Sequence, residues 1–147
     1  MYFATGLVAP VSASVHITSL LKIMYILIDP SEKGKIKVVG FDENEVQVEI
    51  FDAPNREILR SLDSFLQKRN ADKTAVQGIA VVVGVGGFTS TRLATTLGNA
   101  WHFAQKTPLL AVSLDEAIEP QKLITRFGSA KEYILAEYSG EPNVGKI

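Results

Sequence analysis

A short apolar strand, a glycine-rich turn and a long helix follow one another between Val76 and Ala104, and this unit most constrains the fold. The run Ile79–Val83 is rich in β-branched side chains, which is typical of a strand covered on both faces. Gly84, Gly86 and Gly87 come directly after it. Because glycine has no Cβ, the backbone there can turn at positive φ or lie close to a neighbouring segment. The unit predicts an α/β fold in which a helix returns the chain to a parallel strand.

The helix after the turn is predicted from its apolar spacing. Leu93, Leu97 and Trp101 recur at intervals of four residues, which places them on one helix face. Thr89 or Ser90 is expected to cap the helix, because a hydroxyl oxygen can accept a hydrogen bond from a free N–H group of the first turn.

Three strands and a helix are predicted ahead of this unit. The strands are 25–28, 35–41 and 45–51, joined by short turns as an antiparallel meander. In the third strand, Val46, Val48 and Ile50 share one face, and polar side chains occupy the other. Asp52 and Pro54 are expected to open the helix, which carries one apolar stripe: Ile58, Leu59, Leu62, Phe65 and Leu66.

After the unit we expect a buried strand at 109–114, a helix within 115–127 that Pro120 interrupts, and a last strand at 133–138. The predicted fold is therefore α/β, a single ribonuclease-H-like lobe of the kind found twice in actin-like ATPases. It has a mixed five-stranded sheet in the order βββαβαβ, plus a short C-terminal helix and strand.

Composition limits the alternatives. The chain has 147 residues, enough for one domain, and a net charge of -1, so it carries no general basic field for nucleic acid. It has no cysteine, which excludes disulfides and thiolate metal sites and fits a cytoplasmic location. Residues 1–23 are expected to be a leader or to follow a mis-assigned start codon, with Met24 as the functional start. A signal peptide is the alternative, although no Lys or Arg precedes the apolar stretch. The domain is predicted over 24–138 and a tail over 139–147.

Catalytic and metal-binding chemistry finds little support. The glycine turn could hold an anion at the helix N-terminus, but it lacks the Gly-Lys-Ser/Thr of a P-loop, and a tight strand-to-helix turn is the simpler interpretation. A two-metal nuclease needs several carboxylates at the strand ends, whereas only Asp29 and Glu57 are placed near them. His102 has no second histidine four residues away, so it is interpreted as a histidine of the helix surface. We predict no catalytic residue, no metal and no cofactor.

The chain contains the segments YILIDPS, GVGGFTSTR and LGNAWHFAQKTPLLAVSLDEA in this order. Together they resemble the TsaB family, which serves threonylcarbamoyladenosine biosynthesis in tRNA. GVGGFTSTR resembles the family motif GPGSFTGLR, with Val85, Gly87 and Ser90 among the departures. YILIDPS resembles the family's opening strand, and LGNAWHFAQKTPLLAVSLDEA resembles its second helix and following strand. The family is similar to actin-like ATPases and to glycoprotease-like proteins. Only about thirty residues follow Ala117, so the resemblance is to a shortened form that lacks most of the second lobe.

The resemblance implies a non-catalytic scaffold subunit. Its expected partners are a TsaD-type catalytic subunit, as a heterodimer, and a TsaE-type ATPase; tRNA is reached only through the complex, and no membrane is involved. The residues expected at the partner surface are Arg56, Leu59, Arg60, Arg92, Ala94, Gly98 and Trp101. Gly84, Gly86, Gly87 and Thr89 would form a vestigial phosphate turn. In isolation the helix faces are expected to pair as a homodimer. The alternative is a small actin-like domain that binds nucleotide or transfers phosphate.

Overall fold

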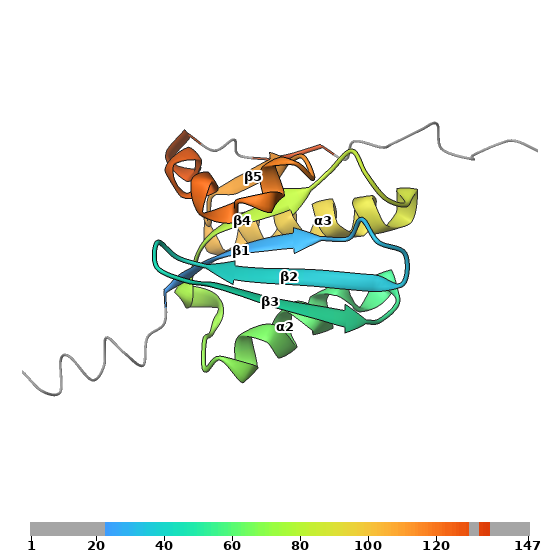
Figure 1. The fold of residues 1–147 in the computed structure, drawn as a ribbon, viewed down its shortest axis with the longest axis horizontal. Helices are drawn as coiled ribbons and strands as arrows, with labels where there is room; N and C mark the ends of the chain where they lie inside the picture. The colour runs from blue at the N-terminus through green and yellow to red at the C-terminus, as the bar shows by residue number, and fades with distance from the viewer. Residues whose placement is uncertain (1–22, 130–132, 136–147) are drawn as a thin grey trace, which may run out of the picture.

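The computed structural model describes residues 23–129 and 133–135, which form a sheet with helical segments on both faces (Figure 1). The expectations for the leader and the tail lie outside these residues, except at Ile23. The five strands are β1 (Met24–Asp29), β2 (Lys35–Phe41), β3 (Val46–Asp52), β4 (Val76–Val82) and β5 (Leu109–Val112). Their spatial order is β3-β2-β1-β4-β5; β2 pairs antiparallel with β1 and β3, whereas β4 pairs parallel with β1 and β5. This sheet confirms the predicted α/β fold class.

Two α-helices cover the same face of the sheet and lie behind it in Figure 1. Helix α2 (Ile58–Lys68) follows the 3₁₀ turn η2 (Asn55–Glu57), and α3 (Phe88–Gln105) follows the glycine turn. A further 3₁₀ turn, η3 (Lys73–Ala75), leads into β4. Asp52 does not open the helix as predicted: it ends β3, where its carboxylate pairs with Lys35 at 2.6 Å. Pro54 instead precedes the first turn, η2.

The sheet separates two apolar cores. The larger one lies between the sheet and α2 and α3, and it includes Ile26, Phe65 and Ala94. The smaller one lies on the opposite face, where Leu123 and Phe127 cover β1, β4 and β5. The Phe127 ring stacks on Tyr25 at 5.0 Å between centroids. A Cβ at Gly78 would lie 2.6 Å from Phe127 Cδ1, so the glycine makes room for this ring.

The C-terminal part differs from the prediction. The segment 115–127 folds as two 3₁₀ segments, η4 (Glu116–Ile118) and η5 (Pro120–Ser129), rather than as an α-helix. Proline lacks the N–H that a continuous helix needs, which accounts for the break at 120. The predicted last strand is wrong over Tyr133–Leu135, which has no strand conformation; its remaining residues lie outside the described part.

Instead, Ile134 lies against α3. The side-chain amide of Asn99 donates to the Ile134 carbonyl at 2.9 Å and accepts from the Ile134 N–H at 2.9 Å. The Ile134 side chain is buried in the larger core. The His102 ring packs edge-on against Tyr133, 5.3 Å between centroids, and its Nδ1 lies 2.7 Å from the Thr107 carbonyl. Asn99 therefore pairs with a passing segment as a neighbouring strand would.

Candidate partner-binding surface

The outer side of α2 brings together three of the residues predicted to bind a partner. Arg56, in η2, and Leu59 and Arg60, in α2, are all exposed. They line an open hollow of about 550 Å³ together with Glu57 and Asp63. Leu59 is a large apolar side chain left 57% exposed, between charged neighbours of both signs. The hollow therefore offers a central apolar contact surrounded by ionic groups.

A second hollow of about 440 Å³ adjoins the first, because Leu59 and Asp63 line both. It extends toward α3, where Trp101 forms part of its wall. Its remaining lining comes from the end of α2 and the following loop: Leu66, Gln67, Ala71, Asp72 and Lys73. We define the α2 docking surface as the lining of these two hollows.

Several residues of the α2 docking surface were not predicted from the sequence. Asp63 and Gln67 follow Leu59 at intervals of four, so helical spacing alone could have placed them beside it. No comparable signal marks Ala71 and Lys73, because they reach the surface through the loop that joins α2 to β4.

The predicted residues of α3 do not all lie on an accessible surface. Ala94 is fully buried in the core under the sheet, and Gly98 is buried beside β4 and β5. A Cβ at Gly98 would lie 3.0 Å from Leu109 Cδ1 and 3.1 Å from Val81 Cγ2. The expectation that Ala94 and Gly98 face a partner is therefore wrong in this structure: small side chains let α3 approach the sheet closely. Arg92 is exposed, with its guanidinium 5.4 Å from the centre of the Phe88 ring.

The glycine turn packs tightly against the start of the β1–β2 connection. Gly84 and Gly86 adopt φ values of +82° and +102°, which L side chains disfavour. A Cβ at Gly86 would lie 2.8 Å from Ser31 Cα and 3.1 Å from the Ser31 carbonyl oxygen. Ser31 is fixed in turn, because its N–H donates to the Asp29 carboxylate at 2.9 Å. Asp29, the last residue of β1, thus fixes the turn that follows the strand.

The cap of α3 differs from the prediction. Gly87 occupies the N-cap position with a φ of -71°, and no side chain caps the helix there. Thr89 and Ser90 lie inside the first turn, so neither is the cap. The Ser90 hydroxyl instead accepts a hydrogen bond from the Asn55 side-chain amide at 3.2 Å, which ties α3 to the turn before α2.

The C-terminal end of α2 is held to β3 by charged groups. Lys68 pairs with the Glu49 carboxylate, and Arg69 Nη1 lies 3.2 Å from it. The hydrogen bond from Lys68 is the largest influence on this carboxyl group and holds the pKa of Glu49 below its usual value; burial opposes the shift and Arg69 adds to it. The Arg69 guanidinium also covers the Phe65 ring at 3.6 Å.

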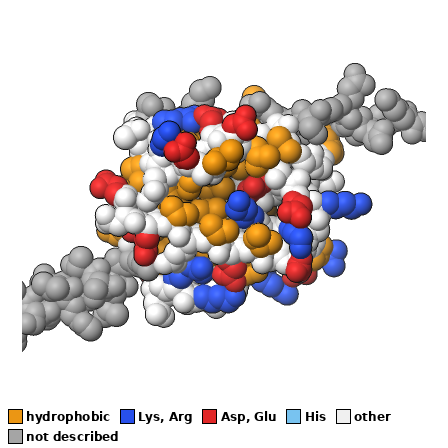
Figure 2. Space-filling model, in the orientation of Figure 1, with side chains coloured by type: hydrophobic (Ala, Val, Ile, Leu, Met, Phe, Trp, Pro, Cys, Tyr) orange, Lys and Arg blue, Asp and Glu red, His pale blue; other side chains and the backbone are white. Residues whose placement is uncertain are grey.

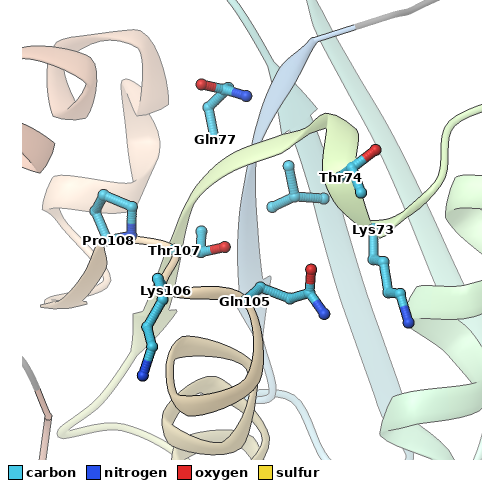
Figure 3. A pocket seen from close by; sticks show the side chains of 8 residues that line it. Lys73, Thr74, Gln77, Gln105, Lys106, Thr107 and Pro108 are labelled. Atoms are coloured by element: carbon cyan, nitrogen blue, oxygen red, sulfur yellow. The ribbon is translucent and has the colours of Figure 1, made fainter.

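Another pocket lies at the start of β4, at the end away from the glycine turn, where α3 ends and β5 begins (Figure 3). Its volume is about 300 Å³. The side chains of Lys73 and Lys106 point away from each other in this view, so their ammonium groups do not converge on one ligand. Across the described residues, no three His, Asp or Glu side chains gather as metal ligands would. In the same part of the chain, no helix is both long and apolar enough to cross a membrane.

The fold of this chain is similar to that of known structures. No family model matches the chain, and no curated protein does. Among solved structures, YeaZ from Pseudomonas aeruginosa matches with a TM-score of 0.56 and 27% sequence identity. The match covers 72% of this chain and 50% of that one. A structure described as an uncharacterized protein with similarity to peptidase YEAZ, also from Pseudomonas aeruginosa, matches with the same values.

This chain thus spans about half the length of the solved chains it matches. The matched part has the actin-like arrangement predicted from the sequence. The matched structures are YeaZ (TsaB) proteins, the family that the glycine motif resembles. The chain is therefore a structural relative of the YeaZ (TsaB) proteins, with the fold of half of that structure.

Proposed function

We propose that this chain is a cytoplasmic, non-catalytic scaffold subunit that binds a TsaD-type catalytic subunit in threonylcarbamoyladenosine modification of tRNAs that read ANN codons. A TsaE-type ATPase joins the complex, and tRNA is reached only through it. The observation that carries the proposal is the match to YeaZ, at 27% identity over 72% of this chain.

The α2 docking surface supports the proposal because it joins an exposed apolar centre to a charged rim. Leu59 and the adjoining Trp101 wall are apolar, whereas Arg56, Arg60 and Asp63 stand around them. Interfaces typically combine a desolvated apolar or aromatic centre with a polar rim. A helix of the partner laid against this surface would bury Leu59. Arg60, whose guanidinium lies 3.9 Å from the Glu57 carboxylate, could exchange that exposed contact for an acidic group of the partner.

The packing of the glycine turn supports a structural role for the residues predicted to form a vestigial phosphate turn. Gly86 is needed because its backbone lies against that of Ser31, whatever else binds there. Asp29 binds the Ser31 N–H within its own turn. The alternative function, a small nucleotide-binding or phosphotransfer domain, rests on the exposed N-terminal turn of α3 and has no further support from the described side chains.

Co-elution with a TsaD-type protein tests the proposal. We expect wild-type chain to form a complex and Leu59→Glu to weaken it about tenfold or more, since a charge at a contact centre costs at least the ~1.4 kcal/mol that tenfold represents. Ile118→Glu is the matched control, because Ile118 is a 74% exposed apolar residue on η4 and does not line the α2 docking surface. ATP binding by the chain alone, at low micromolar concentration, together with no complex, would favour the alternative and overturn the scaffold function.

A further inference from the structure

The edge strand β3 carries three of its four apolar side chains on the solvent side of the sheet, whereas Phe51 packs against the larger core. Val46, Val48 and Ile50 are 41%, 51% and 55% exposed, although their alternation is that of a buried face. The polar side chains of the same strand, Gln47 and Glu49, face α2, where Lys68 and Arg69 bind them. Hydrophobic side chains cover the middle of the sheet face that lies toward the viewer in Figure 2. We call Val46, Val48 and Ile50 the β3 strip.

The same residues direct their backbone groups outward from the sheet. The Asp42 N–H donates to the Glu45 carbonyl, and the Ala53 N–H donates to the Gly34 carbonyl. Both contacts continue the β2–β3 register, in which the odd-numbered residues of β3 bond to β2. Hydrogen-bonded positions alternate along an antiparallel pair, so the N–H and C=O groups of residues 46, 48 and 50 point away from β2. Among the described residues, no strand pairs with this edge.

Natural sheets protect such an edge with lysine, proline, a bulge or an inward-pointing charge. β3 has neither lysine nor proline, and it pairs with β2 without a register shift. Its one charged interior residue, Glu49, points toward α2 and is neutralised there by Lys68 and Arg69. The edge is therefore open both to backbone pairing and to apolar contact.

We propose that β3 pairs antiparallel with β3 of a second copy of this chain, with Val48 on the two-fold axis. Val48 then faces its own counterpart, and Val46 faces Ile50 of the other copy. All three pairs are hydrogen-bonded positions, each exchanging two backbone bonds. The two β3 strips form one apolar band across a continuous sheet.

The register follows from side-chain chemistry. An axis at Glu49 would oppose two like carboxylates, which destabilises a strand pair. An axis at Gln47 would leave Ile50 without an apolar counterpart. The axis at Val48 matches every member of the β3 strip and sets Gln47 opposite Glu49, an amide that can donate to a carboxylate.

The helices allow this approach. α2 packs over β2, where the Phe65 ring occupies the space that a Cβ of Gly40 would need, 2.8 Å away. Three strand spacings of about 4.8 Å would then separate α2 from its counterpart by about 14 Å, more than the ~10 Å of a packed helix pair. The α2 docking surface is not used, so the dimer neither depends on the proposed scaffold function nor competes with it.

The test uses the absence of cysteine from this chain. In full-length Val48→Cys, the two introduced residues would face each other across the axis with Cα atoms about 5.5 Å apart, within disulfide range. Val46→Cys is the matched control on the same strip, since its two copies would lie about 14 Å apart, four residues out of register. We expect rapid oxidation of Val48→Cys to a covalent dimer and little from Val46→Cys. Equal oxidation of both variants, oxidation of neither, or faster oxidation of Val46→Cys would overturn the proposal.

A second measurement needs no oxidation. Sedimentation velocity of the wild-type chain, from low micromolar to several hundred micromolar, should show a concentration-dependent dimer. Val48→Lys, which sets two like charges on the axis, should weaken it at least tenfold, whereas Leu59→Lys on α2 should leave it unchanged. A wild-type monomer throughout, or a dimer lost in Leu59→Lys and kept in Val48→Lys, contradicts pairing through β3. Co-elution of Val48→Lys with the TsaD-type protein is scored separately, so the two proposals can fail independently.

Discussion

Replacing Gly86 by alanine should destabilise the fold through two separate effects. Its φ of +102° is unfavourable for an L side chain, at a cost of roughly 1–2 kcal/mol. The new Cβ would also lie 2.8 Å from Ser31 Cα, which belongs to the backbone and cannot rotate away. Overpacking of this kind costs about 1–3 kcal/mol. The sum is about 2–5 kcal/mol, a large part of the ~5–15 kcal/mol that stabilises an ordinary domain.

Gly84→Ala separates the two effects. Gly84 also has a positive φ, +82°, but nothing lies within 4 Å of its Cβ position. This variant should therefore lose only the conformational part, roughly 1–2 kcal/mol. Equilibrium urea unfolding measures both variants, and with a slope of about 1–3 kcal/mol per molar the midpoint of Gly86→Ala should fall roughly 1 M further. Equal losses in the two variants would refute the claim that the turn is fixed by its contact with Ser31.

Three further variants probe the structure. Glu49→Gln should make the stability of the fold less sensitive to acid. The pKa of Glu49 is lower in the folded than in the unfolded state, so the carboxylate stabilises the fold above about pH 4.3 and this contribution is lost as the pH falls further. The urea midpoint of the variant should therefore change less between neutral pH and pH 3 than that of wild type. Asn99→Asp should release Ile134, since a carboxylate cannot donate to its carbonyl; amide exchange at Ile134 should rise, with a stability loss of about 1–3 kcal/mol, and unchanged exchange would contradict the pairing. Thr95→Val should be neutral or stabilising by up to about 1–2 kcal/mol in thermal unfolding, because Thr95 Oγ1 is buried without a hydrogen-bond partner among the described residues; a clear loss would indicate a partner for that hydroxyl.

The elements of the sheet were predictable because each depends on local signals. The strand 35–41 was predicted with its observed bounds, and the strand predicted at 45–51 is observed one residue later, as Val46–Asp52. Alternation with a period of two identifies a strand, and a turn marks its end. In the C-terminal segment the local pattern was misleading, because it predicted a strand at 133–138 and Tyr133–Leu135 has no strand conformation. Ile134 lies where the Asn99 side chain holds it, a contact 35 residues apart that no local pattern records.

The residues of the docking surface were predictable only in part. Arg56, Leu59 and Arg60 lie together because they are close in sequence: Leu59 and Arg60 belong to α2, and Arg56 belongs to the turn before it. Ala94 and Gly98 were assigned to the wrong contact, because small side chains permit close approach to a sheet and to a partner helix equally well. Which contact they make depends on the rotation of α3 about its axis, and packing against β4 and β5 sets that rotation.

By itself, the sequence determined the strand–turn–helix unit around Gly84, Gly86 and Gly87, the order of the strands and α-helices as far as β5, and which side chains share a face. Those properties follow from backbone sterics and from the periods of strand and helix. Only the tertiary structure decided which face is buried. In β3 the face of the β3 strip is the open one, because Lys68 and Arg69 at the end of α2 bind Gln47 and Glu49 on the other face. Alternation fixes the relation between two faces of a strand, whereas burial depends on what the rest of the chain places against each.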